Sequence, residues 1–160
     1  MPFSGLHHVT GITGDAQTNV DFYVGLLGLR LVKRTVNHND AFTLHLFYGD
    51  AVGSPGSLLT FFVWPDAARG RQGAGQFGDV GLMVPRERIG DWVQRLLSRG
   101  VAFGGPTQVG DTSRLTLTDP DGLAVEIVGV ADAPEGHPAA QYRDIEPRVF
   151  FVTQVIRASR

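Results

Sequence analysis

The chain has 160 residues, of which 42% are hydrophobic and 19% are charged, and its formal net charge at pH 7 is −2. These values are typical of one compact domain with a single core, and the slightly acidic balance offers no attractive field for a polyanion, so we expect no nucleic-acid partner. The absence of cysteine excludes disulfides, a thiolate nucleophile and cysteine-type zinc sites, so any metal must be bound through nitrogen and oxygen.

The first half of the chain predicts one strand, one helix and three further strands. The strand-like run Gly5-Leu6-His7-His8-Val9-Thr10 is followed by Asp15, a good helix N-cap. Apolar residues at the i, i+3, i+4 and i+7 spacing predict an amphipathic helix after it, and Gly28 is placed to end that helix. Aliphatic and aromatic residues then predict strands over residues 29–36, 42–48 and 57–64.

The second half repeats this order after a glycine-punctuated segment. Residues 66–76 lack apolar periodicity, which predicts a linker, and their glycines fit no phosphate-binding loop. A strand over residues 77–84 and a helix from Pro85 to Gly100 follow. Strand-like pieces then lie around residues 101–103, 114–118 and 123–128, the last two joined by a tight turn.

The recurring order predicts an α+β fold of two paired βαβββ modules, at residues 5–65 and 77–131. We expect their strands to form a curled, mostly antiparallel mixed β-sheet around a cavity. Residues 132–160 form a C-terminal extension, in which the apolar run 149–156 would add a strand to its own sheet or to a neighbour's. We expect no membrane partner and a cytoplasmic location, because no run is long and apolar enough to cross a bilayer and no secretory signal opens the chain.

Candidate site residues lie on the first and last predicted strands of the repeat. Because side chains alternate along a strand, His8 shares a face with Thr10, and His7 points to the opposite face. His7 is then structural, or contacts substrate if the strand is bulged. We hypothesise that His8 and Glu126 are two ligands of a divalent metal, with a solvated outward position as the alternative for Glu126. For His45 the alternatives are a structural role and a place in the cavity lining.

Three stretches resemble the vicinal oxygen chelate superfamily, which includes glyoxalase I, bleomycin-resistance proteins and extradiol dioxygenases. They are residues 6–10 (LHHVT), 21–29 (DFYVGLLGL) and 119–126 (DPDGLAVE). More narrowly, five further stretches resemble the amino-terminal half of the hydroquinone-type ring-cleaving dioxygenases in that superfamily. They are residues 31–37 (LVKRTVN), 45–50 (HLFYGD), 53–56 (GSPG), 59–62 (LTFF) and 69–71 (RGR).

The resemblance implies a glyoxalase-type fold and, in complete members, an iron(II) or manganese(II) site of two histidines and one carboxylate. Such a site binds an aromatic diol and oxygen together. His8 matches the first ligand of the family, and Thr10 matches a residue close to it. Complete members take the other two ligands from the last of four modules, and the positional counterparts here are Asp79 and Glu126. Asp79 stands where the family has a histidine, and Thr116 stands where it has an active-site tyrosine.

Three classes of function follow from these residues. The first is a metal-dependent relative of the ring-cleaving dioxygenases that acts on aromatic diols with oxygen, or an inactive half of a longer dioxygenase. The second is a metal-free protein of the bleomycin-resistance type that binds a small molecule. The third is a glyoxalase-type isomerase or lyase, whose fourth ligand would fall near Leu59 or Thr60, where no good ligand stands. A swapped homodimer would set His8 of one subunit beside Asp79 and Glu126 of the other.

Overall fold

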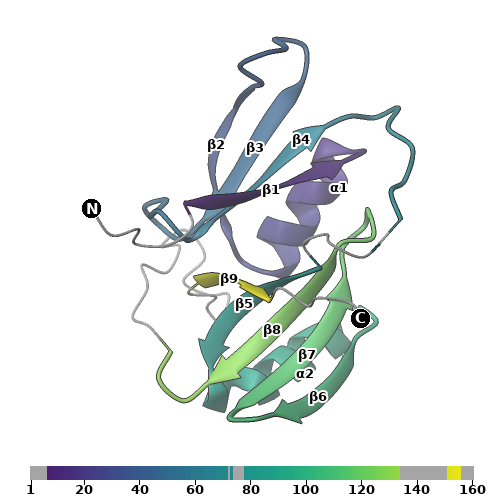
Figure 1. Ribbon diagram of the computed structural model, residues 1–160. Helices are drawn as coiled ribbons and strands as arrows, with labels where there is room; N and C mark the ends of the chain where they lie inside the picture. The colour runs from purple at the N-terminus through teal and green to yellow at the C-terminus, as the bar shows by residue number, and fades with distance from the viewer. Residues whose placement is uncertain (1–6, 72, 74–77, 134–150, 156–160) are drawn as a thin grey trace.

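The computed structural model describes residues 7–71, 73 and 78–133, together with the backbone of residues 151–155 (Figure 1). The first part of the chain forms a four-stranded sheet, sheet A, with a helix against one face. Its elements are β1 (His8–Thr13), α1 (Ala16–Val20), η1 (Asp21–Leu26), β2 (Arg30–Val36), β3 (Leu44–Gly49) and β4 (Leu58–Val63). The strand order is β1-β4-β3-β2, with β1 parallel to β4 and the other neighbours antiparallel.

The second part forms a five-stranded sheet, sheet B, in the order β6-β7-β8-β5-β9. Its elements are β5 (Asp79–Pro85), η2 (Arg86–Arg88), α2 (Ile89–Ser98), β6 (Gly104–Val109), β7 (Thr112–Thr118), β8 (Ala124–Val130) and β9 (Phe151–Val155). Strands β5 to β8 repeat the arrangement of β1 to β4, because β5 is parallel to β8. The paired βαβββ fold is therefore confirmed. β9 pairs antiparallel with β5, so the terminal apolar run adds a strand to its own sheet.

The first helix begins where the sequence predicts but changes its winding midway. Asp15 caps α1 by accepting a hydrogen bond from the backbone N–H of Thr18 at 2.7 Å. The continuation is a π-helix, in which the Leu27 N–H donates to the Phe22 carbonyl at 3.0 Å, five residues back. The predicted helix is therefore present, but only α1 has α-helical winding, and η1 is a π-helix. Gly28, with a φ of 74°, adopts the left-handed conformation that commonly follows a helix.

One predicted strand is wrong. Residues 101–103 form no strand, and the outer strand of sheet B is β6, which begins immediately after them. The Val101 N–H donates to the Leu96 carbonyl at 3.0 Å, and Val101 and Phe103 then pack against the core as part of a loop. Every residue of β6 is exposed, so no alternation of buried and exposed positions marks this strand in the sequence.

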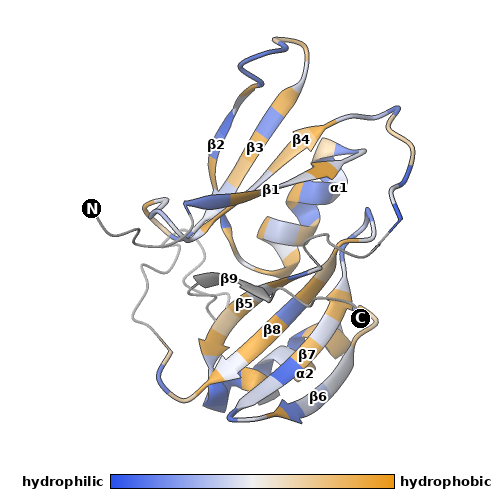
Figure 2. Cartoon of the chain, viewed as in Figure 1, coloured by the Kyte–Doolittle hydropathy of each residue, from blue (hydrophilic) through white to orange (hydrophobic). Residues whose placement is uncertain are grey.

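One hydrophobic core joins the two parts of the chain. It contains buried side chains from both sheets and both helical segments, including Tyr23, Phe61 and Trp92 at its centre. In Figure 2, apolar residues fill long stretches of β5 and β8. The Tyr23 hydroxyl also donates to the buried Asp119 carboxylate at 2.9 Å, which links η1 to the turn between β7 and β8. Packing and this hydrogen bond together tie the helix of the first part to the second part.

Sheet A has one face against the helix and one open face. We define the open face by alternate side chains of its four strands: His8, Thr10, Ile12, Lys33, Thr35, His45, Phe47, Thr60 and Phe62. The register sets Thr10 opposite Thr60 and Thr60 opposite Phe47, so polar and aromatic groups form continuous rows across the strands. Ile12 is 49% exposed, which indicates that this face is accessible to a ligand.

Several predictions concern residues outside the described ranges. These are residues 5–6 of the predicted first module, residues 72 and 74–76 of the predicted linker, residue 77 of the predicted second module, and residues 134–150 and 156–160 of the predicted extension. The module boundaries stay predictions. Among the described residues, no helix has the length and apolar character needed to cross a membrane, and the cytoplasmic location stays a prediction.

Candidate functional site

The two neighbouring histidines lie together at the start of β1. His8 is the first residue of the strand, His7 precedes it, and both are exposed. Their Nδ1 atoms are 3.0 Å apart, and their rings form a T-shaped contact with centroids 5.2 Å apart. The prediction that strand alternation separates the two side chains is wrong, because His7 lies before the strand begins. Both imidazoles are therefore available at the same end of the sheet.

A chain of hydrogen bonds crosses the open face from β1 to β3. The hydroxyl oxygens of Thr10 and Thr60 are 2.8 Å apart, and Nε2 of His45 is 3.0 Å from the Thr60 oxygen. Both distances are typical of hydrogen bonds. Thr60 is fully buried, whereas Thr10 is exposed, so the chain connects an enclosed group with one that a ligand can reach.

Aromatic neighbours hold the imidazole of His45 in place. The ring lies close to those of Phe47 and Phe62, with both pairs of centroids 4.1 Å apart. Burial lowers the pKa of His45 below its usual value of 6.5, and repulsion from His8 and Lys33 lowers that pKa further. The neutral imidazole is therefore favoured, and one of its ring nitrogens can accept a hydrogen bond.

A hollow of about 920 Å³ lies beside the open face, next to β1. Its walls include Thr10, Ile12, Trp64 and Arg69. Trp64 is 38% exposed and stacks on Phe62, with centroids 5.8 Å apart and an interplanar angle of 13°. The hollow has room for an aromatic ring, and the indole offers that ring a flat surface to stack against.

A second hollow, of about 540 Å³, lies against sheet B. Asp79 on β5, Thr116 on β7 and Glu126 on β8 all contribute to its wall. The structure therefore brings together the two predicted carboxylate ligands and the residue at the family's tyrosine position. Thr116 and Glu126 are directly opposite each other in the register of β7 and β8.

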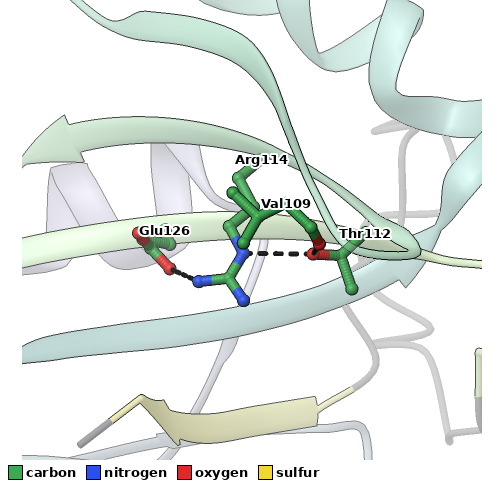
Figure 3. A network of polar contacts seen from close by, with 4 residues as sticks. All are labelled: Val109, Thr112, Arg114 and Glu126. Carbon is green, nitrogen blue, oxygen red and sulfur yellow. Dashed lines mark hydrogen bonds and ion pairs between the residues drawn. The ribbon is translucent and has the colours of Figure 1, made fainter. Parts of the chain in front are cut away.

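The carboxylate of Glu126 is only 1% exposed and forms an ion pair with an arginine (Figure 3). Arg114 Nη1 donates to Glu126 Oε2 at 3.0 Å, and Arg114 Nε donates to the Thr112 hydroxyl at 3.1 Å. The Thr112 hydroxyl in turn donates to the Val109 carbonyl at 2.8 Å. Glu126 is therefore not the solvated outward side chain that the sequence left open, and the guanidinium partly neutralises its charge.

The three predicted metal ligands do not form a metal site within one chain. His8 belongs to sheet A, whereas Asp79 and Glu126 border the hollow of sheet B. In the described ranges, no group of three or more histidine, cysteine, aspartate or glutamate side chains is arranged to hold a metal ion. The donor types suit a hard or borderline divalent ion, but their positions in a single chain do not fit one.

The site contains residues that motif reading did not identify. Arg114 could have been found from the hairpin register, because it lies diagonally across from Glu126 on the adjacent strand. The role of Thr60 could not, because its contact with Thr10 depends on the pairing of β4 with β1, which is distant in sequence.

The family model described as the Glyoxalase/Bleomycin resistance protein/Dioxygenase superfamily matches residues 5–127. The chain belongs to this superfamily, as the resemblance of its motifs predicts.

Its relatives include proteins named as dioxygenases. MhqO of Bacillus subtilis strain 168, named as a ring-cleaving dioxygenase, is 44% identical over 124 residues, which cover 78% of this chain and 39% of MhqO. The chlorohydroquinone/hydroquinone 1,2-dioxygenase of Sphingobium indicum is 37% identical over 127 residues, which cover 78% of this chain and 40% of that enzyme. A crystal structure of a dioxygenase from Bacillus subtilis superposes on this chain with a TM-score of 0.81 at 38% sequence identity. The match covers 92% of this chain and 46% of the other. The chain spans less than half the length of these proteins.

Proposed function

We propose that the chain forms part of a metal-dependent site of the ring-cleaving dioxygenase type, which receives an aromatic diol and oxygen. The observation that carries this proposal is the position of His8 and Thr10, which are exposed at the open face within the region that the superfamily model matches. One relative is named as a chlorohydroquinone/hydroquinone 1,2-dioxygenase and another as a ring-cleaving dioxygenase. The aromatic surface of Phe62 and Trp64 beside them supports an aromatic ligand.

The complete site is proposed to lie between two copies of the chain. His8 of one subunit would join Asp79 and Glu126 of the other, because these donors lie on different sheets of one chain. Iron(II) or manganese(II) is the proposed ion, since imidazole and carboxylate ligands suit both. Such an ion, when bound, would hold the diol and oxygen next to each other. Arg114 would offset part of the charge of the two carboxylates.

Metal content of the reconstituted protein tests this proposal. Protein loaded anaerobically with iron(II) or manganese(II) is expected to bind stoichiometric metal, and His8→Ala and Glu126→Gln are expected to lose it. The matched controls are His38→Ala and Glu87→Ala, which alter an exposed histidine and an exposed glutamate away from these donors. Metal-free wild-type protein would contradict the dioxygenase proposal.

A mixture of the two variants tests the shared site. After refolding together, half of the dimers contain one subunit of each variant, and each of these has one site with both wild-type residues. The mixture is therefore expected to recover about a quarter of the wild-type metal content and of the oxygen consumption with hydroquinone. No recovery on mixing, or a monomer by light scattering, would contradict the shared site.

The ion pair between Arg114 and Glu126 favours a second candidate, a metal-free protein that binds a small aromatic molecule. In that case the ion pair with Arg114 keeps Glu126 from binding a metal, and the hollows bind the small molecule without catalysing a reaction. Hydroquinone binding without metal uptake and without oxygen consumption would support this candidate over the dioxygenase.

A further inference from the structure

The hydrogen-bonded chain of Thr10, Thr60 and His45 joins three strands of sheet A. Each threonine hydroxyl has a single proton, and a neutral imidazole has one donor nitrogen and one acceptor nitrogen. When Nε2 of His45 accepts, Thr60 must donate to it, and Thr10 must then donate to Thr60. When Nε2 donates, the Thr60 oxygen can accept from both neighbours or donate to Thr10. Two of these arrangements run in a single direction along the chain.

The two arrangements give Thr10 opposite properties. When Nε2 of His45 accepts, Thr60 donates to His45 and Thr10 donates to Thr60, so the Thr10 oxygen offers its lone pairs to the open face. When Nε2 donates and Thr60 donates to Thr10, Thr10 directs its proton to the open face. His45 thus controls the hydrogen bonding of Thr10 through Thr60.

We propose that His45 is a positioning residue: it accepts a hydrogen bond at Nε2 and thereby makes Thr10 an acceptor for a hydroxyl group of an aromatic diol. The proposal rests on the proposed function in one respect, since it takes the open face beside His8 as the ligand side of sheet A. The close contacts of the imidazole with Phe47 and Phe62 fix the direction of Nε2.

The surroundings of His45 allow the accepting arrangement. Acceptance at Nε2 requires a neutral imidazole, and the partly buried ring is repelled by the charges of His8 on β1 and Lys33 on β2. The remaining neighbours across the adjacent strands, Thr35 and Phe62, carry no charge. Burial of the ring and the charges of His8 and Lys33 therefore oppose a protonated imidazole, which could only donate.

The tautomer of His45 gives the first test. The full chain labelled with nitrogen-15 at histidine and kept in EDTA is expected to have a protonated Nδ1 and an unprotonated Nε2 at His45 near pH 8, with the signals assigned by their loss in His45→Phe. A protonated Nε2 would overturn the proposal, because Nε2 would then donate to Thr60 and would no longer require Thr10 to donate to Thr60.

Two probes of similar shape give the second test, again on metal-free full-length protein. Hydroquinone can donate hydrogen bonds, whereas 1,4-dimethoxybenzene can only accept them. Fluorescence of Trp64 reports binding, and Trp64→Phe identifies its signal beside that of the buried Trp92. The wild type is expected to prefer hydroquinone by about five- to tenfold, the usual effect of one hydrogen bond.

The variants separate a positioning role from a structural one. His45→Phe and Thr60→Val are expected to reduce the preference to about twofold or less, because Thr10 then rotates freely. Thr60→Ser keeps the hydroxyl, Thr35→Val removes a hydroxyl that faces His45 from β2, and both are expected to keep the wild-type preference.

An unchanged preference in His45→Phe and Thr60→Val would overturn the proposal, even if both probes bound more weakly. Failure of both probes to bind the wild type would overturn it as well. Metal uptake and oxygen consumption play no part in these measurements, so the proposed function can fail or succeed independently.

Discussion

At the scale of single residues, the ion pair between Arg114 and Glu126 governs the chemistry of the hollow in sheet B. Glu126 is almost completely buried, and the Arg114 side chain is 17% exposed. A carboxylate in this position is costly without a cation beside it. Asp79 adds a second carboxylate to the same wall.

We predict that Arg114→Met lowers the free energy of unfolding by about 3–5 kcal/mol, because it leaves the buried Glu126 charge without this partner. Urea denaturation at pH 7.5 measures the change. Arg34→Met, at an exposed position of β2, is the matched control and is expected to change stability by about 0.5 kcal/mol or less. Combining Arg114→Met with Glu126→Gln is expected to restore most of the loss. A change of about 1 kcal/mol or less in Arg114→Met alone would contradict this account.

At the scale of elements, the π-helix η1 depends on a side chain from the other half of the chain. Arg95 on α2 donates from Nε to the Leu26 carbonyl at 2.7 Å and from Nη2 to the Gly25 carbonyl at 3.0 Å. These carbonyls lie at the end of η1, where a helix has no further backbone N–H groups to donate to them. The fork of the guanidinium serves two acceptors at once, which a single ammonium group does less well.

Replacing Arg95 by methionine is expected to cost about 2–3 kcal/mol of stability, since two carbonyls lose charged donors. Arg95→Lys should fall between this variant and the wild type. Chemical denaturation gives the free energies, and hydrogen exchange of residues 21–28 should accelerate selectively in the methionine variant. Arg99→Met, one turn later and exposed, serves as the control. Equal effects at both positions would mean that η1 does not depend on Arg95.

These elements also mark how far the sequence could predict the fold. The strands β2, β3 and β4 were predictable because each is a run of aliphatic and aromatic residues between turn signals. The π-helix was not, because residues 21–26 continue an ordinary helical pattern and the donor at position 95 lies far along the chain. In the site, the resemblance of residues 119–126 to the superfamily identified Glu126 as a candidate, but the ion pair and the threonine chain depend on strand register.

At the scale of the whole molecule, the two sheets differ in how their equivalent strands are covered. β1 is an outer strand of sheet A, whereas its counterpart β5 has β8 on one side and β9 on the other. Unpaired strand edges invite pairing with another chain. A second copy that reaches His8 would therefore approach along β1 and the open face, while β9 keeps the edge of β5 occupied.

We predict that removal of residues 151–160 makes the protein self-associate, because the deletion strips β9 from β5 and leaves backbone groups of residues 79–83 without their partners. Val80 and Leu82 on this strand are almost completely buried in the full chain. An uncovered strand edge with such apolar residues has a higher tendency to pair with another chain. Sedimentation velocity should give an apparent mass that rises with concentration more steeply than for the full chain. Removal of residues 156–160 leaves β9 intact and should behave like the full chain. If the longer deletion sediments like the full chain at every concentration, the edge of β5 does not pair with a second copy when it is uncovered, and β9 is not needed to protect it.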